Sequence, residues 1–155
     1  MFKFLESLQE AEKNVRTIDH MLYVTYPLIK DKRILIKVLK ESKNSIFLCI
    51  SAILQYEYIN KRITLYEDSK SNFNTFIECS KRYGITRDEI KKIFELHDII
   101  ERHKESAIEF YKNGKLVILS ENMTQRLISL EKTKEFLELS KEILKKSKDS
   151  IIHRQ

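Results

Sequence analysis

The sequence is poor in several residue types that common functional motifs require. Its 155 residues include two glycines, one proline, two cysteines and no tryptophan. Phosphate-binding loops, nucleophile elbows and dinucleotide fingerprints need several glycines at fixed spacing, so Gly84 and Gly114 cannot build one. The scarcity of turn residues also argues against β-sandwiches and β-barrels. What remains is a single, mostly helical domain over residues 1–155.

Long hydrophobic runs are missing as well. The longest, residues 46–54, is interrupted by Ser51 and is much shorter than the ~20 residues that span a bilayer. No signal peptide is expected, and Cys49 and Cys79 form no Cys-x-x-Cys pair. Cys49 is predicted to be a buried free thiol. We therefore expect a cytoplasmic protein that does not associate with membranes.

The spacing of hydrophobic residues predicts five helices. Residues 46–54 are apolar almost all round, which places their helix at the centre of the bundle. Pro27 disfavours helix at Tyr26 and predicts a break there. The predicted helices cover about residues 3–23, 32–62 and 69–83, a helix that begins at the capping box Thr86–Glu89, and about residues 130–150.

The hydrophobic period changes at residues 107–120, where Asn113-Gly114 is a strong signal for a two-residue turn. The turn pairs Ile108 with Leu119 and Phe110 with Val117. The predicted fold is therefore a mostly α bundle of about five helices, with a small antiparallel β-hairpin before the last helix (α+β by strict count). Two outcomes are open for the hairpin. Either a third strand over residues 124–128 completes a small sheet, or one face of the hairpin contacts a partner.

The positive charge is concentrated in one segment. The net charge is +6, and residues 30–62 contain eight basic and three acidic residues. Basic residues spaced three and four apart share one helix face and suit phosphate groups, whereas the simpler interpretation is a solvated helix face. The predicted nucleic-acid-binding residues are Lys30, Arg33, Lys37 and Lys40.

The predicted helices carry apolar stripes that we expect to face the core, such as Phe4, Leu8, Ala11, Val15, Ile18 and Leu22 in the first helix and Ile93 and Phe94 in the fourth. Several polar residues continue these stripes. Buried charges are costly unless they are paired, so these residues either form ion pairs or line a cleft. This predicted inward polar cluster consists of Glu57, Asn60, His97, Glu101 and Lys104.

Metal and cofactor motifs are absent from the sequence. Neither Glu-x-x-His nor His-Glu-x-x-His occurs, so we expect no metal and no cofactor. Two Arg/His pairs are candidates for catalysis, in which an arginine holds a phosphate and a histidine transfers a proton. These are Arg16 with His20 and Arg102 with His103. The structural alternatives are a salt-bridge row and favourable cations at a helix C-terminus.

The succession of amphipathic helices with a long central helix and dispersed Arg and His resembles the HEPN group of small helical proteins, over residues 1–106 and 130–155. Many members of this group are ribonucleases that use an Arg, four to six intervening residues and then a His. Here three residues separate Arg16 from His20, and none separates Arg102 from His103. The resemblance therefore implies a non-catalytic or divergent member.

Three functions follow as predictions. The favoured one is a non-enzymatic module that binds RNA or another polyanion. The second is an assembly or adaptor protein that forms a homodimer through the hairpin face and exposed tyrosines, Tyr56 and Tyr58. The third is a divergent, metal-independent ribonuclease that uses one of the Arg/His pairs. Whether the protein is an enzyme is left open by the sequence, which favours a binding module.

Overall fold

Long helices build most of the molecule. The computed structural model describes residues 2–105, 108–112, 115–119 and 125–152. A π-helical turn, Met21–Thr25, follows the first helix, and a 3₁₀ turn, Ser80–Tyr83, follows the fourth. The elements are α1 (Lys3–His20), α2 (Tyr26–Ile29), α3 (Arg33–Ile59), α4 (Ser69–Cys79), α5 (Arg87–Glu105), β1 (Ile108–Lys112), β2 (Lys115–Leu119), β3 (Gln125–Ile128) and α6 (Leu130–Ile152).

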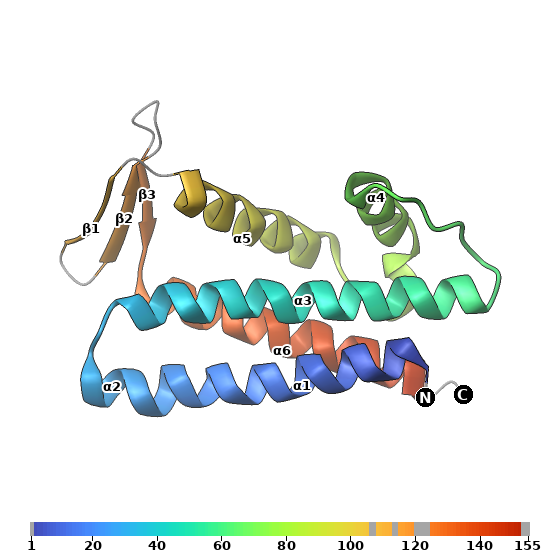
Figure 1. Cartoon of the computed structure of the whole chain (residues 1–155), viewed down its shortest axis with the longest axis horizontal. Helices are drawn as coiled ribbons and strands as arrows, with labels where there is room; N and C mark the ends of the chain where they lie inside the picture. The colour runs from blue at the N-terminus through green and yellow to red at the C-terminus, as the bar shows by residue number, and fades with distance from the viewer. Residues whose placement is uncertain (1, 106–107, 113–114, 120–124, 153–155) are drawn as a thin grey trace.

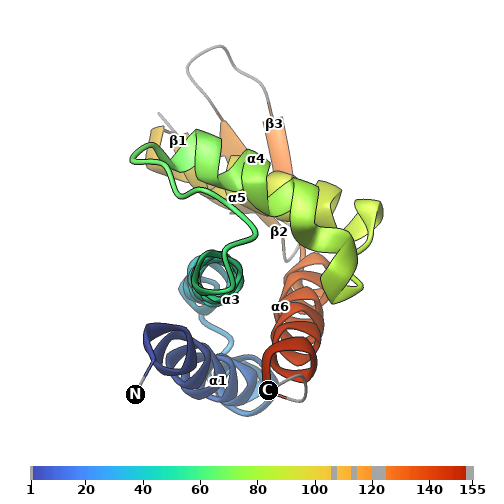
Figure 2. The ribbon, with the colours of Figure 1, turned by 90° about the vertical axis from the view of Figure 1, so that its right-hand side faces the viewer.

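The helices form two layers around one central helix. Three long helices, α1, α3 and α6, lie side by side, and α4 and α5 lie across them (Figure 1). The end-on view shows α1, α3 and α6 as the lower group and α4 with α5 above it (Figure 2). Because α3 contacts α1, α6, α4 and α5, it occupies the centre of the bundle, as predicted.

The buried residues of α1 confirm the predicted apolar stripe. Phe4, Leu8, Ala11, Val15 and Ile18 are all buried at spacings of three and four. The middle of α3 is buried on almost all sides, which explains its lack of a polar face between residues 45 and 54. Burial of each such aliphatic side chain contributes roughly 1.5–3 kcal/mol, so tertiary packing rather than helix propensity holds these helices.

The predicted break at Tyr26 is wrong. Tyr26 is helical with φ −58°, and helical structure continues through Pro27 to Ile29. The π-helical turn just before α2 widens the backbone by one residue, and the proline sits in the first turn of α2, where a missing N–H does little harm. The chain instead turns at Lys30, which adopts the left-handed conformation with φ 57°.

The fold-class prediction also needs correction. Among the described residues there are six α-helices rather than five, since α2 is separate, and the element before α6 is not a two-stranded hairpin. Strand β2 pairs antiparallel with both β1 and β3 in a small three-stranded sheet. The β1–β2 partners include Ile108↔Leu119 and Phe110↔Val117. A hairpin alone is marginally stable, which gives the third strand its physical reason. The predicted turn residues, Asn113 and Gly114, lie outside the described residues.

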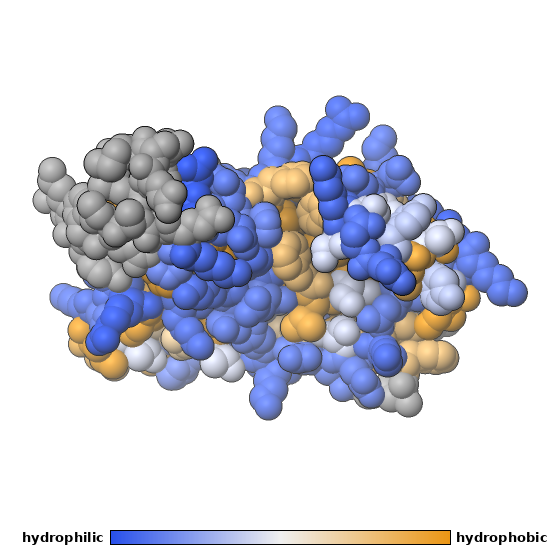
Figure 3. Space-filling view, turned by 45° about the horizontal axis from the view of Figure 1, so that its top comes forward, coloured by the Kyte–Doolittle hydropathy of each residue, from blue (hydrophilic) through white to orange (hydrophobic). Residues whose placement is uncertain are grey.

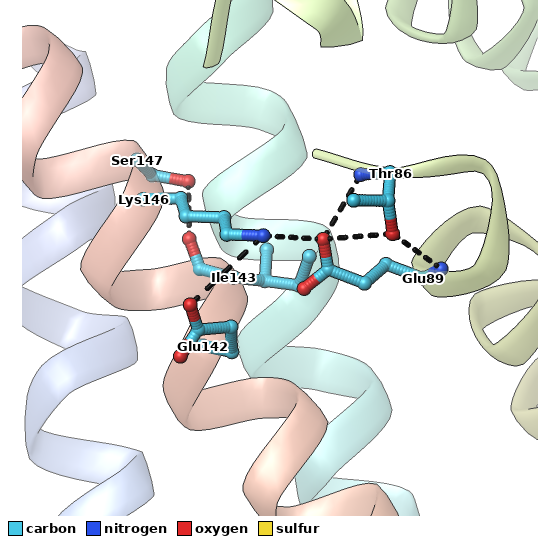
Figure 4. Close-up of polar contacts among 6 residues, drawn as sticks. All are labelled: Thr86, Glu89, Glu142, Ile143, Lys146 and Ser147. Carbon is cyan, nitrogen blue, oxygen red and sulfur yellow. Dashed lines mark hydrogen bonds and ion pairs between the residues drawn. The ribbon is translucent and has the colours of Figure 1, made fainter. Parts of the chain in front are cut away.

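The start of α5 shows how local sequence and long-range packing cooperate. As predicted, Thr86 and Glu89 form a capping box, in which Thr86 Oγ1 accepts from the Glu89 N–H at 3.1 Å and Glu89 Oε1 accepts from the Thr86 N–H at 2.9 Å. The same Glu89 oxygen also contacts Lys146 Nζ of α6 at 2.5 Å (Figure 4). One carboxylate therefore both caps α5 and ties it to α6.

The charge of Glu89 follows from these contacts. Burial raises its pKa, but the hydrogen bonds from Lys146 and Thr86 outweigh burial, so the pKa of Glu89 lies below its ordinary value. The carboxylate is thus stabilised in its charged form in the folded protein.

Replacing Glu89 is expected to destabilise the fold. Glu89→Ala should lower the free energy of unfolding by about 2 kcal/mol, because it removes charge-assisted hydrogen bonds and leaves Lys146 without its short-range partner. Asp88→Ala, an exposed acid in the same helical turn, is the control and should change it by less than about 0.5 kcal/mol. Urea denaturation at pH 7 measures both.

The pH dependence has a defined sign. A lowered folded-state pKa stabilises the protein above the pKa of the unfolded chain, and this contribution is lost as the pH falls through the folded value. The difference between wild type and Glu89→Ala should therefore shrink below about pH 4. A difference that stays constant down to pH 2 would contradict the role given to this carboxylate.

Candidate functional site

The predicted basic residues lie at the beginning of α3, but they do not all belong to it. Lys30 stands in the left-handed turn that separates α2 from α3, whereas Arg33, Lys37 and Lys40 lie on α3. Lys30, Arg33 and Lys37 are exposed, and Lys40 is half-buried. The structure therefore brings three exposed cations to the α2–α3 turn and the first turns of α3.

Acidic neighbours accompany two of these cations. Arg33 Nη2 lies 2.6 Å from Asp31 Oδ2, and Lys37 Nζ lies 3.8 Å from Glu41 Oε1. The Arg33 guanidinium holds the pKa of Asp31 below its ordinary value. Both pairs lie at the surface, where water and salt weaken an ion pair, so the two cations can exchange these partners for a phosphate group.

The predicted inward polar cluster is divided among separate places. Glu57 is fully buried near the end of α3, whereas Asn60 lies just beyond α3 and is exposed. Glu101 lies on α5 between Lys43 and Lys104, with Oε1–Nζ distances of 3.4 Å and 3.3 Å. Contacts with both ammonium groups, first of all that of Lys104, lower the pKa of Glu101.

His97 is exposed because the buried stripe of α5 is not the predicted one. Phe94, which the prediction placed in the core, is half-exposed, and the His97 ring lies 5.9 Å from that of Phe47. The residues of α5 that enter the core are Ile93, Leu96, Ile99 and Ile100. The stripe through Phe94 and His97 instead faces outward.

The two candidate catalytic pairs lie on different helices, on opposite sides of α3 (Figure 1). Arg16 of α1 is exposed and contacts Glu12 at 3.2 Å, and His20 is exposed at the end of that helix. Arg102 of α5 donates to Asp98 at 3.0 Å, and His103 is half-buried. Both arginines therefore have a carboxylate partner on their own helix. The salt bridge agrees with the structural alternative for Arg16, and Arg102 lies in the last turn of α5, as its own alternative requires.

A cluster around Glu57 is the main feature that sequence reasoning missed. Glu57 Oε2 accepts from Arg62 Nη1 at 2.7 Å, and Oε1 lies 3.4 Å from Arg82 Nη1. The Arg62 guanidinium also stands over the ring of Tyr56 at 5.9 Å. Burial and then the negative charge of Glu57 raise the pKa of the adjacent Tyr83. The available signal was the Lys-Arg dipeptide, which occurs at 61–62 and again at 81–82.

A second missed feature is a set of aromatic rings between α3, α4 and α5. Phe73 contacts Phe94 at 5.0 Å and Phe47 at 6.4 Å in edge-on geometry. Figure 3, which looks toward α4 and α5, shows hydrophobic surface in the middle of this face with hydrophilic side chains on both sides. The available signal was that each of these three helices contains a phenylalanine in its apolar pattern.

A groove of about 610 Å³ runs between α1 and α3. Asn14 crosses it and donates to the Glu41 backbone oxygen at 3.0 Å and to Ser45 Oγ at 2.7 Å. The lining residues are Glu10, Lys13, Asn14, Thr17, Glu41, Asn44, Phe47 and Leu48. This lining includes no histidine or cysteine.

Metal and thiol chemistry find little support in the described part of the chain. There, no group of three or more His, Cys, Asp or Glu side chains is placed to hold a metal ion. Cys49 and Cys79 are free and buried, and burial raises the pKa of Cys49 to about 12 and that of Cys79 to about 11. Thiolates are the reactive form of cysteine, so neither residue is suited to act as a nucleophile.

Comparison with known proteins adds no identification. No protein-family model matches the chain, and no curated protein matches it. Of the helices that the structure describes, none combines the length and the hydrophobicity needed to cross a membrane.

Both thiols are expected to be inert while the protein is folded. With Ellman's reagent at pH 8, the thiols of the native protein should react far more slowly than those in 6 M guanidinium chloride. In the denaturant, two thiols per chain should react. Rapid reaction of either thiol in the native protein would contradict the burial of the two side chains.

Proposed function

We propose that the protein is a cytoplasmic, non-enzymatic module that binds the phosphate backbone of RNA. The observation that supports this proposal is the group of exposed cations Lys30, Arg33 and Lys37 at the α2–α3 turn. Lys30 stands in the turn, and the other two are one helical turn apart on α3, so together they present charge along a short path.

The energetics of the group suit a polyanion. Each cation that replaces a condensed counterion on the nucleic acid contributes to affinity by counterion release. The weak surface pairs with Asp31 and Glu41 leave Arg33 and Lys37 able to exchange partners. Contacts of this type bind without reading bases, so the proposed binding is independent of sequence.

Removal of two of these charges should weaken RNA binding and its salt dependence. For Arg33→Gln with Lys37→Gln, the slope of log K against log salt for a single-stranded RNA should fall by about 1.4, at roughly 0.7 per lost contact. Fluorescence anisotropy with a labelled oligonucleotide, between 50 and 200 mM KCl, measures the slope.

The matched control is Arg87→Gln with Lys145→Gln, which removes the same charges from exposed positions on α5 and α6. It should keep the wild-type slope. Equal losses in the two double variants would show that net charge alone drives binding, and an unchanged affinity in the first variant would refute the proposed surface.

Self-association is a second candidate function, which the exposure of hydrophobic side chains beside the same turn favours. Leu28 is 81% exposed and Ile29 is 64% exposed, and both follow the exposed Tyr23 and Val24. Exposed apolar patches of this kind are typical of contact surfaces. The tyrosines named from the sequence differ in environment, because Tyr56 packs edge-on against Phe4 at 5.3 Å whereas Tyr58 is exposed.

If this patch joins two copies of the chain, Leu28→Glu with Ile29→Glu should convert the dimer into a monomer. Burial of a charge in an apolar contact is strongly unfavourable, so the expected loss of dimer affinity exceeds tenfold. Leu65→Glu with Tyr66→Glu, at exposed positions between α3 and α4, is the control and should leave the dimer intact. Sedimentation velocity across a concentration series reads the result, and a wild-type monomer at 1 mM would exclude self-association.

The resemblance to HEPN proteins and the ribonuclease alternative stay predictions. Arg16 and Arg102 are paired with carboxylates on their own helices, Glu12 and Asp98, which favours the binding function over catalysis.

A further inference from the structure

The cluster around Glu57 holds two arginine side chains next to each other at the end of α3. Both guanidinium groups approach the same buried carboxylate, one at each oxygen. We propose that Arg62 and Arg82 form an anion site for a phosphate group, and that Glu57 is the positioning residue that holds them together. This site is separate from the cations at the start of α3 and does not rest on the function proposed for them.

The carboxylate does not use up the hydrogen-bonding capacity of the two arginines. A guanidinium group carries five N–H donors, and Arg62 and Arg82 each approach Glu57 through Nη1. Their side chains are 41% and 47% exposed, whereas Glu57 is fully buried. Solvent and a ligand can therefore reach part of each arginine side chain, while the carboxylate between them is enclosed.

The charge around the pair favours an anion. Lys61 and Lys81 precede the two arginines and are exposed. In residues 57–62 and 78–82, the acidic residues are Glu57 and Glu78. Four cations thus stand against two carboxylates, one of which is inside the fold. Arginine pairs commonly bind phosphate with paired, charge-assisted hydrogen bonds, which makes phosphate the expected ligand class.

The backbone fixes the position of Arg62. Lys61 adopts the left-handed conformation with φ 59°, and the Arg62 N–H donates to the Glu57 backbone oxygen at 3.0 Å. This is the six-to-one bond of a Schellman motif at the end of α3. Glu57 therefore holds Arg62 twice, through its backbone oxygen and through its carboxylate.

A turn also fixes the segment of Arg82. Arg82 lies in the 3₁₀ turn that Gly84 ends with φ 71°, and the Ile85 N–H donates to the Ser80 backbone oxygen at 3.3 Å across it. Since both arginine segments are held before any ligand arrives, little backbone ordering accompanies binding. The competing interpretation is an ion-pair cluster that only joins α3 to the 3₁₀ turn.

Titration with a phosphate compound distinguishes the two interpretations. Isothermal titration calorimetry with sodium pyrophosphate should give one site per wild-type chain. Arg82→Gln should weaken this binding at least tenfold, and it retains the shorter Arg62–Glu57 ion pair, so the fold is expected to persist. Arg87→Gln, an equal charge change at an exposed position outside the cluster, should stay within twofold of wild type.

Glu57→Gln tests the positioning role. It raises the net positive charge, so attraction by net charge alone predicts tighter pyrophosphate binding, whereas a site held by the carboxylate predicts binding weaker by about tenfold. Circular dichroism and a thermal melt of each variant establish that it is folded before titration. A wild-type protein that shows no saturable binding, or equal losses in Arg82→Gln and Arg87→Gln, would overturn the proposal.

The source of the phosphate is decided by a second ligand. If Arg82→Gln weakens both pyrophosphate and a single-stranded RNA, the site contacts the nucleic-acid backbone, and if it weakens pyrophosphate alone, the site takes a small phosphate compound. Arg33→Gln with Lys37→Gln should leave pyrophosphate binding unchanged in either case. If that double variant bound pyrophosphate more weakly, binding would depend on the overall positive charge, and the assignment of the site to Arg62 and Arg82 would be overturned.

Discussion

The burial of the middle of α3 on almost all sides is the constraint on which the rest of the structure depends. Helix α3 contacts α1, α6, α4 and α5, and between residues 45 and 54 few of its positions reach the surface. Such a helix is stable only when other helices cover it, because its exposed form would leave a large apolar surface in water. The two-layer arrangement follows, with α1 and α6 on one side and α4 and α5 on the other (Figure 2).

Small residues allow this packing to be close. Ser45 of α3 is buried, and so are Ser140 and Ser147 of α6. Each hydroxyl donates to a backbone oxygen of its own helix, at Glu41, Leu137 and Ile143 respectively. Each serine hydroxyl thus finds its acceptor on its own helix, and Ser45 also accepts from Asn14 of α1. Because their side chains are small, these serines let α3 and its neighbours approach.

Periodicity predicts which elements exist more reliably than it predicts which face is buried. The stripe of α1 and the capping box at Thr86 depend on local spacing, and both are confirmed. In α5 two apolar stripes compete, and only packing shows that Ile99 and Ile100 are inside whereas Phe94 faces outward. The break predicted from Pro27 is wrong for a similar reason. A π-helical turn precedes the proline, and its presence cannot be predicted from the sequence pattern.

Periodicity also does not show which residues of different helices come together, and the predicted inward polar cluster illustrates this. Glu57 faces inward, as predicted, but the prediction grouped it with residues of α5 such as His97 and Lys104. Its ion-pair partners are Arg62 and Arg82, which are twenty positions apart in the sequence. They meet because the end of α3 lies next to the 3₁₀ turn in space. A contact between two chain reversals cannot be derived from the period of either helix.

The central helix also determines where charge can collect. Because residues 45–54 of α3 are enclosed, the exposed cations lie on either side of them, with Arg33 and Lys37 at the start of α3 and Lys61 and Arg62 just beyond its end. At 1.5 Å per residue, the 27 residues of α3 separate these groups by roughly 40 Å. That distance exceeds the Debye length of about 8 Å at physiological salt several times over, so the two groups act as independent sites. The requirement to bury one helix therefore divides the positive charge of the segment into two separate surfaces.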